Sequence, residues 1–259
     1  MKIGMFGDSY IAYLKNTWIA HLNSKSRDYN IETYGKGGSN LFYAIDKFHH
    51  AVNRINKKYD VVVFTFTWHQ RQYSAWPYRN DQYCSFSESR DFTTYANADG
   101  LNDSGIHDDA TNAEFIATIP KFYEYMYDDR WTRFDYELEV RYILELPDRY
   151  PDTKFVFLPN TEHARGIAKK YFSKGVLVDL AFETVSSSEP NAPAPPEPGE
   201  KINFGRDQRI GHLNQNNHRA VGELMHDIIS NYQEVKDKVY QVDFNKFDMT
   251  FPTKSVSEP

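Results

Sequence analysis

Cysteine is almost absent from the sequence, since Cys84 is the only one in 259 residues. A single cysteine cannot form an internal disulfide, and a lone thiol is more often inert than catalytic. The chain is therefore neither a disulfide-stabilised scaffold nor a dithiol redox protein.

Long apolar runs and long basic runs are also missing. No segment approaches the roughly 20 apolar residues that span a membrane, and the N-terminal segment lacks the apolar core of a signal peptide. We therefore expect a soluble protein, cytoplasmic or released by lysis, that does not bind membranes. The formal net charge is −6, and no basic run is long enough to neutralise phosphates, so we expect no nucleic-acid partner.

Aromatic residues, in contrast, are abundant and make up 16% of the chain. A chain of this length, with 40% hydrophobic residues, fits one large domain around a single core. Such a core does not need all 19 Tyr and 18 Phe, so part of the aromatic surface should serve another purpose. We expect a single domain over residues 1–235 and an irregular tail over residues 236–259.

Short apolar runs alternate with patterns of helical spacing. The run Val61–Phe64 is apolar on both faces, as expected for a central strand of a parallel sheet. Strands that alternate with helices predict βαβ units, and therefore an α/β fold on a parallel sheet. The five expected strands lie at Lys2–Phe6, Ile31–Tyr34, Val61–Phe64, Phe155–Leu158 and Val176–Leu180, and the expected helices begin at or just after Ser9 and cover about 41–55, 136–144 and 221–232.

Two segments break this alternation. The first, at about 70–131, is polar and rich in aromatic residues, and we expect it to be an insertion rather than a domain. The second, at about 186–200, contains Ala-Pro-Ala-Pro-Pro-Glu-Pro, which neither a helix nor a strand ladder accommodates. We expect an extended surface loop there.

Three motifs lie where strands end or helices begin. Gly7-Asp8-Ser9-Tyr10 places Ser9 at the start of a helix, where free amide protons favour negative charge. Gly35-Lys36-Gly37-Gly38-Ser39-Asn40 is a turn that lets a backbone amide face a neighbouring site, although it lacks the ending of a P-loop. His212 stands just before the last helix. Taken one at a time, a capping serine, a plain turn and a capping histidine are the simpler interpretations.

In this order, the motifs together resemble those of the SGNH (GDSL-like) serine hydrolases. The resemblance rests on Gly-Asp-Ser after the first strand, a Gly-x-x-Gly-like loop after the second, Tyr-Asp-Val-Val-Val in the third, Arg-Tyr-Pro-Asp-Thr-Lys before the fourth and His-Leu-Asn before the closing helix. It spans roughly residues 1–68 and 132–232. It implies a flavodoxin-like three-layer α/β/α sandwich with a central parallel sheet of about five strands.

Carried over residue by residue, the resemblance implies that Ser9 is the nucleophile and also donates one oxyanion-hole amide. Gly38 would donate the second amide, and His212 would be the base that takes the serine proton and returns it to the leaving group. Asp8 resembles the motif aspartate, a structural residue that buttresses the turn. We expect no cofactor and no metal, because Leu101 interrupts the oxygen ligands of the one segment that resembles a calcium loop.

The third strand end departs from the family pattern. Where the family has Gly-x-Asn-Asp, this chain has Thr67-Trp68-His69-Gln70. His69 or Gln70 would then supply the side-chain donor of the oxyanion hole. The alternative is that His69 only packs against Trp68.

The acid of the triad also departs from the pattern. Three residues before the base, where the family has its acid, stands Arg209, and a cation there cannot orient the imidazole. Asp207 is the nearest carboxylate and our candidate for the acid. The alternative is a backbone carbonyl that orients His212, which leaves a Ser–His dyad.

These residues predict a serine ester hydrolase. Its substrate would be a small-molecule or glycan ester. We favour carbohydrate O-acetylesterase activity, because four aromatic residues could stack on pyranose rings. Alternatively, these aromatic residues pack together as a small satellite core under the insertion. An O-acyltransferase would use the same Ser9 and His212, whereas a catalytically decayed module would only bind a glycan or a protein. The oligomeric state stays open. The four aromatic residues are Trp68, Trp76, Tyr78 and Tyr83.

Overall fold

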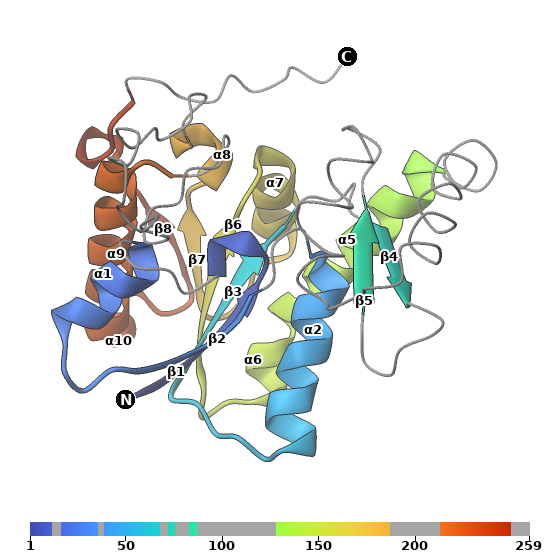
Figure 1. Cartoon of the computed structure of the whole chain (residues 1–259), viewed down its shortest axis with the longest axis horizontal. Coiled ribbons are helices and arrows are strands. Elements are labelled where there is room, and N and C mark those ends of the chain that lie inside the picture. Colours follow the sequence, from blue (N-terminus) through green and yellow to red (C-terminus); the bar gives the residue numbers. More distant parts are fainter. Residues whose placement is uncertain are drawn as a thin grey trace, which may run out of the picture.

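A computed structural model describes residues 1–11, 17–35, 39–67, 72–75, 83–86, 128–186 and 213–249. Within them, a six-stranded parallel sheet lies between two layers of helices, which confirms the predicted α/β fold (Figure 1). The strand order is β2-β1-β3-β6-β7-β8, so the sheet has one strand more than the sequence predicts. These strands are β1 (Lys2–Gly7), β2 (Asn30–Gly35), β3 (Val61–Phe66), β6 (Lys154–Pro159), β7 (Val176–Asp179) and β8 (Lys238–Gln241).

Helices cover both faces of the sheet. On one face lie α1 (Trp18–Lys25) and α9 (Gln215–Ser230), and on the other α2 (Leu41–His49), α5 (Asp129–Leu144) and α7 (Glu162–Tyr171) (Figure 1). Two strands in the expected insertion, β4 (Gln72–Ala75) and β5 (Tyr83–Phe86), form a second, antiparallel sheet. The shorter helical elements are η1 (Ser9–Ile11), η2 (His50–Arg54), α6 (Leu146–Arg149), α8 (Phe182–Val185), α10 (Tyr232–Val235) and η4 (Phe244–Lys246).

The apolar run of β3 shows why the sheet is covered on both sides. Successive residues of a strand point to opposite faces, so a strand between two helical layers is apolar throughout. Val61 and Val63 belong to the core that contains α1 and α9, whereas Val62 and Phe64 belong to the core that contains α2 and α5. All four side chains are buried.

Local chemistry sets the ends of two predicted helices. α5 ends at Leu144, shortly before Pro147, because proline has no amide proton to continue the helix. α9 begins after Asn214, whose side chain accepts a hydrogen bond from the backbone N–H of Asn217 at 2.8 Å. The end of α5 agrees with the predicted 136–144, whereas α9 begins six residues before the predicted 221–232.

The first helix differs from the prediction of a helix that begins at Ser9. A short 3-10 turn covers Ser9–Ile11 instead, and α1 begins at Trp18. The carbonyl of Asp8 accepts the N–H of Ile11 at 3.0 Å, which closes the tighter i to i+3 ring of a 3-10 turn. The polypeptide therefore turns sharply at Ser9 before the helix starts.

The segment after residue 236, which we expected to be irregular, contains the sixth strand. β8 pairs in parallel with β7, with Val239 opposite Leu177. The sequence of β8 has only two apolar residues, Val239 and Tyr240, which are partly buried against the two opposite cores, so it lacks the apolar run that predicted the other strands. The carboxylate of Asp237 also accepts the N–H of Gly175 at 2.9 Å, which attaches the start of β8 to the start of β7.

The strand order creates a switch point beside β1. The chain leaves β1 toward β2 on one side, whereas β3 lies on the other side. In open α/β sheets, ligands bind at such a point, outside the carboxyl ends of the strands. The motif Gly7-Asp8-Ser9 follows β1 at this end of the sheet.

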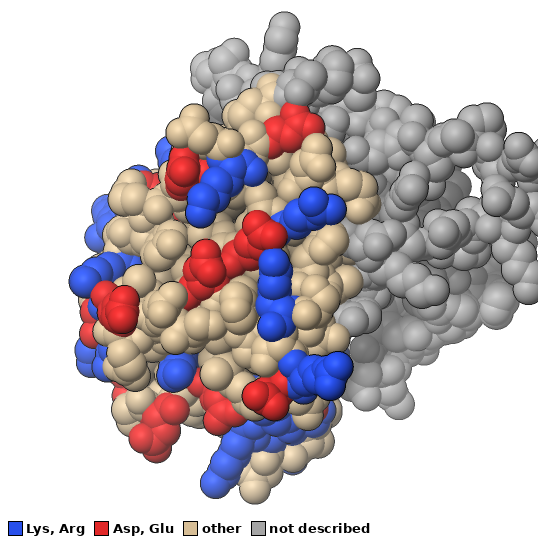
Figure 2. Space-filling model, turned by 90° about the vertical axis from the view of Figure 1, so that its left-hand side faces the viewer, with Lys and Arg blue, Asp and Glu red and all other residues tan. Residues whose placement is uncertain are grey.

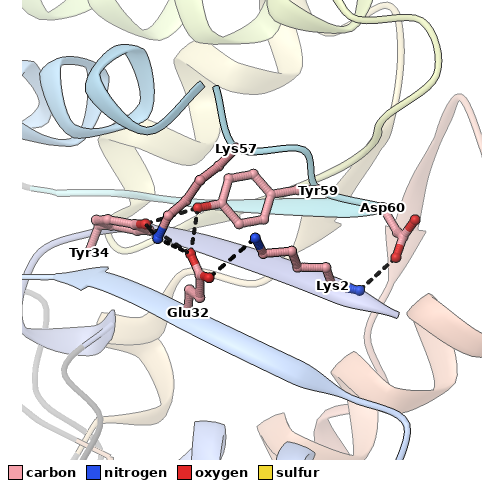
Figure 3. Close-up of polar contacts among 6 residues, drawn as sticks. All are labelled: Lys2, Glu32, Tyr34, Lys57, Tyr59 and Asp60. Atoms are coloured by element: carbon pink, nitrogen blue, oxygen red, sulfur yellow. Dashed lines mark hydrogen bonds and ion pairs between the residues drawn. The ribbon is translucent and has the colours of Figure 1, made fainter. Parts of the chain in front are cut away.

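A polar cluster centred on Glu32 lies at the β2 edge of the sheet (Figure 3). The Glu32 carboxylate accepts hydrogen bonds from Lys57 Nζ at 2.7 Å and from Tyr59 OH at 2.8 Å. Tyr34 OH also donates to it at 2.9 Å, and Lys2 Nζ lies 3.3 Å away. Burial alone would raise the pKa of Glu32, but these donors outweigh burial and lower the pKa to about 2. The cluster attaches the segment that precedes β3 to the edge strand.

We expect Glu32→Gln to lower the melting temperature by about 2–4 °C, which corresponds to roughly 1 kcal/mol in a chain of this size. The folded-state pKa of Glu32 lies below the unfolded value of about 4.3, so its stabilisation is present above that pH and is lost as the pH falls toward 2. Urea denaturation should therefore show a smaller loss of unfolding free energy on acidification in the variant than in the wild type.

Glu223→Gln is the matched control for this prediction. Glu223 pairs with Lys25 at 2.9 Å and joins α9 to α1, but its side chain is 49% exposed. These helices lie on the side seen in Figure 2, where acidic and basic side chains are interspersed. An exposed pair contributes little, so this variant should keep the wild-type melting temperature. Identical behaviour of the two variants would contradict the role assigned to Glu32.

Candidate active site

The turn after β1 is built around Asp8, which is fully buried. Its carboxylate Oδ1 accepts the backbone N–H of Tyr10 at 3.1 Å, and its carbonyl accepts the N–H of Ile11 at 3.0 Å. Ser9 lies between these anchored residues, and its backbone begins η1. The side chain and the backbone of Asp8 thus both hold the turn that carries the candidate nucleophile.

Two glycines allow this turn to approach its neighbouring strands. A Cβ atom on Gly7 would lie 1.9 Å from Thr65 Oγ1, and a Cβ atom on Gly35 would lie 2.6 Å from the carbonyl oxygen of Asp8. Real Cβ atoms do not come that close to other atoms. Glycine at both positions therefore keeps the end of β1 and the turn against β2 and β3.

Residues from two further strand ends converge on Asp8. Thr67, directly after β3, donates from Oγ1 to Asp8 Oδ2 at 2.9 Å. Asn160, directly after β6, donates from Nδ2 to Asp8 Oδ1 at 3.1 Å. Both side chains are 1% exposed. Neither residue is among the site residues predicted from the sequence, although a polar residue at the carboxyl end of a strand is a signal that could have identified both.

The start of α2 is attached to the same turn. Ser39 Oγ donates to the carbonyl of Gly7 at 3.3 Å, and Thr67 Oγ1 lies 3.3 Å from the carbonyl of Ser39. Tyr136 of α5 closes the other side, since its OH donates to the carbonyl of Thr67 at 2.6 Å. Ser39, which directly precedes the N-cap residue of α2, therefore contacts the end of β1.

A second link joins the turn to the start of α9. Ser186 Oγ donates to the carbonyl of Phe182 at 2.7 Å, so in its 3.1 Å contact with Tyr10 OH it is the acceptor. Ser186 also forms an isolated antiparallel β-bridge with Leu213. Tyr10 and Leu213 directly follow Ser9 and His212 in the sequence, and both are buried in the same core. Ser186 thus connects the segment of the candidate nucleophile with that of the candidate base.

Trp18 and His218 strengthen this link. The indole N–H of Trp18 donates to the carbonyl of Tyr10 at 2.7 Å. The backbone N–H of Trp18 donates to His218 Nδ1 at 3.1 Å, so His218 caps the start of α1 and carries its ring proton on Nε2 when it is neutral. The first turn of α9 is held against α1 and η1 in this way.

Three of the predicted site residues lie among the described residues. Asp8 and the backbone of Ser9 lie at the carboxyl end of β1, and Tyr83 begins β5. The described residues contain no group of three or more His, Cys, Asp or Glu that could hold a metal ion. None of the described helices has the length and apolar character needed to cross a membrane. Outside the described residues lie Gly38, Trp68, His69, Gln70, Trp76, Tyr78, Asp207 and His212.

No protein-family model and no curated protein matches the chain. Among solved structures, a putative lipolytic protein of the G-D-S-L family from Desulfitobacterium hafniense DCB-2 is 12% identical over 88% of this chain and 98% of its own, with a TM-score of 0.41. The acetyl xylan esterase AlAXEase is 11% identical over 95% of this chain and 94% of its own, with a TM-score of 0.32.

Proposed function

We propose that the protein is a serine ester hydrolase of the SGNH type, with Ser9 as nucleophile and His212 as base. The observation that carries the proposal is the link through Ser186. Tyr10 contacts its side chain and Leu213 pairs with its backbone, so residues adjacent to Ser9 and to His212 meet at one point. We therefore propose that Ser9 and His212, although far apart in the sequence, act together.

The chemistry would follow from these positions. His212 removes the proton of Ser9 as Oγ attacks the ester carbonyl, and the same proton then goes to the leaving alcohol. Water hydrolyses the acyl-enzyme in the second half of the reaction. The amides of Ser9 and Gly38, with His69 or Gln70, would bind the oxyanion. The contact of Ser39 with the carbonyl of Gly7 supports this role of Gly38, because Ser39 directly follows Gly38 in the sequence.

An acetylated carbohydrate is the substrate class that we propose. Trp131 and Phe134 on the first turns of α5 are 65% and 52% exposed, and their rings meet edge to face at 6.1 Å. Tyr136 attaches the same helix to Thr67 at the end of β3. Trp131 precedes Tyr136 by five residues, which is a rise of about 7.5 Å along the helix. Exposed aromatic rings near the switch point could stack on sugar rings, as could the aromatic residues predicted from the sequence.

A fluorophosphonate probe tests the proposed chemistry directly. We expect covalent labelling of the wild-type protein at Ser9, located by peptide mapping, together with hydrolysis of p-nitrophenyl acetate and release of acetate from acetylated oligosaccharides. Labelling with acyl transfer to a sugar but without hydrolysis would favour the acyltransferase. A protein that is neither labelled nor active would favour the binding module.

A further inference from the structure

Asn160 occupies a well-defined place beside the candidate nucleophile. It directly follows β6 and is 1% exposed. Its backbone N–H donates to the carbonyl of Phe66 at 2.9 Å, and its own carbonyl accepts the N–H of Glu183 at 2.9 Å. The backbone is therefore held on both sides, and the side-chain amide reaches Asp8 at 3.1 Å.

One polar atom of the Asn160 side chain lowers the stability of the folded protein. Only its amide nitrogen can donate to the Asp8 carboxylate, which fixes the orientation of the carboxamide. Within the described part of the chain, the buried Oδ1 of Asn160 then has no hydrogen-bond partner. A buried carbonyl oxygen without a donor destabilises the folded state. The benefit of asparagine must therefore come from the donor that it presents to Asp8.

That donor shares its acceptor with the backbone next to Ser9. Asp8 Oδ1 accepts both Asn160 Nδ2 and the N–H of Tyr10, each at 3.1 Å. Thr67 holds the other carboxylate oxygen at 2.9 Å. With both oxygens held, the carboxylate cannot rotate about its Cβ–Cγ bond. Without Asn160, the oxygen that anchors the Tyr10 amide is less constrained.

We propose that Asn160 is a positioning residue for the nucleophile. It holds Asp8 in the orientation that fixes the Tyr10 amide and, through that amide, the place of Ser9. The inference rests on the proposed function of Ser9 and needs no contact between Asn160 and the substrate. A displacement of about 1 Å at a reacting group can lower turnover by about 10²-fold, so a small rotation of the turn is sufficient.

The experiment compares the wild type with variants at Asn160 and Tyr232. It measures steady-state hydrolysis of p-nitrophenyl acetate and the rate of fluorophosphonate labelling. All measurements are made at a temperature at which circular dichroism shows that each variant is folded. Asn160→Ala should lower kcat and the labelling rate by about 10- to 10²-fold, with KM changed by less than about twofold. Tyr232→Phe is the matched control, because its buried hydroxyl accepts the N–H of Phe155 at 3.0 Å near the opposite end of β6. It should lower the melting temperature and leave kcat unchanged.

Asn160→Asp adds a readout that a merely structural role would not move. Near neutral pH, two adjacent carboxylates repel each other, and kcat should fall below that of the alanine variant. As the pH falls, the pair takes up one proton, and the new O–H can donate to Asp8. The kcat of the aspartate variant, divided by that of the alanine variant, should therefore rise toward acidic pH.

The outcomes separate the two proposals. A wild-type protein that is neither labelled nor active overturns both. With an active wild type, a kcat for Asn160→Ala within about twofold of wild type, or a pH-independent ratio of the two variants, overturns only the role of Asn160. If Asn160→Ala does not fold, Thr67→Val and Thr67→Ser test the other carboxylate oxygen. The valine variant should then lose activity and the serine variant keep it, and equal activities would overturn the inference.

Discussion

Ser9→Ala should abolish hydrolysis of p-nitrophenyl acetate and fluorophosphonate labelling, with a loss in kcat of about 10⁴-fold or more. Oγ is the atom that forms the acyl bond, and alanine offers no substitute. The melting temperature should stay close to that of the wild type, because the turn is held by Asp8 and by the backbone of Tyr10 and Ile11. Activity assays, labelling and thermal denaturation of the same preparation measure all three quantities. Labelling that survives in the variant would remove Ser9 from the mechanism.

His212→Ala should cause nearly the same loss, because nucleophile and base act as one unit. The double variant should then be little worse than either single variant. His226→Ala is the control, since His226 contacts Tyr29 OH at 2.9 Å between α9 and the start of β2, and its loss should leave kcat unchanged. Losses that multiply in the double variant would show that Ser9 and His212 act independently.

Asp207→Asn should lower kcat by up to about 10⁴-fold near neutral pH if Asp207 orients His212. Asparagine keeps the size of the side chain but removes the charge that holds the imidazole tautomer and stabilises the imidazolium. The pH profile of kcat, measured with Ser9 intact, distinguishes this effect from a loss of folded protein.

Arg209→Asp provides the opposing test of the same acid. Its carboxylate would stand three residues before His212, where the SGNH pattern has it. A protein that lacks an effective acid should become faster, whereas one already served by Asp207 should gain nothing or slow down through repulsion between two carboxylates. If Asp207→Asn has no effect and Arg209→Asp does not accelerate the wild-type rate, both triads are wrong and a backbone carbonyl orients the base.

Much of the fold could be predicted because its determinants are local. The run Val61–Phe64 is apolar on both faces wherever it is placed, and Pro147 ends a helix whatever packs against it. The edge strand β8 could not be predicted, because its four residues owe their conformation to backbone pairing with β7. Ser9 stood out for a local reason too, as a serine between a short apolar strand and a helical pattern.

In the candidate site, too, some features could be predicted from the sequence and others only from the tertiary structure. The sequence alone determined which residues are candidates for the proposed reaction, since Ser9, His212 and the glycine turn are recognisable by residue type, by their order and by their positions at strand ends and before a helix. Only the tertiary structure decided which residues hold the turn that carries Ser9. Asp8 meets Thr67 and Asn160 because the sheet order places β1 beside β3 and β3 beside β6, and Tyr10 meets Leu213 through Ser186. The periodicity of apolar residues depends only on residues close together in the sequence. Strand order depends on residues far apart in the chain, which must bury both faces of the sheet and also pair the backbone hydrogen bonds of adjacent strands.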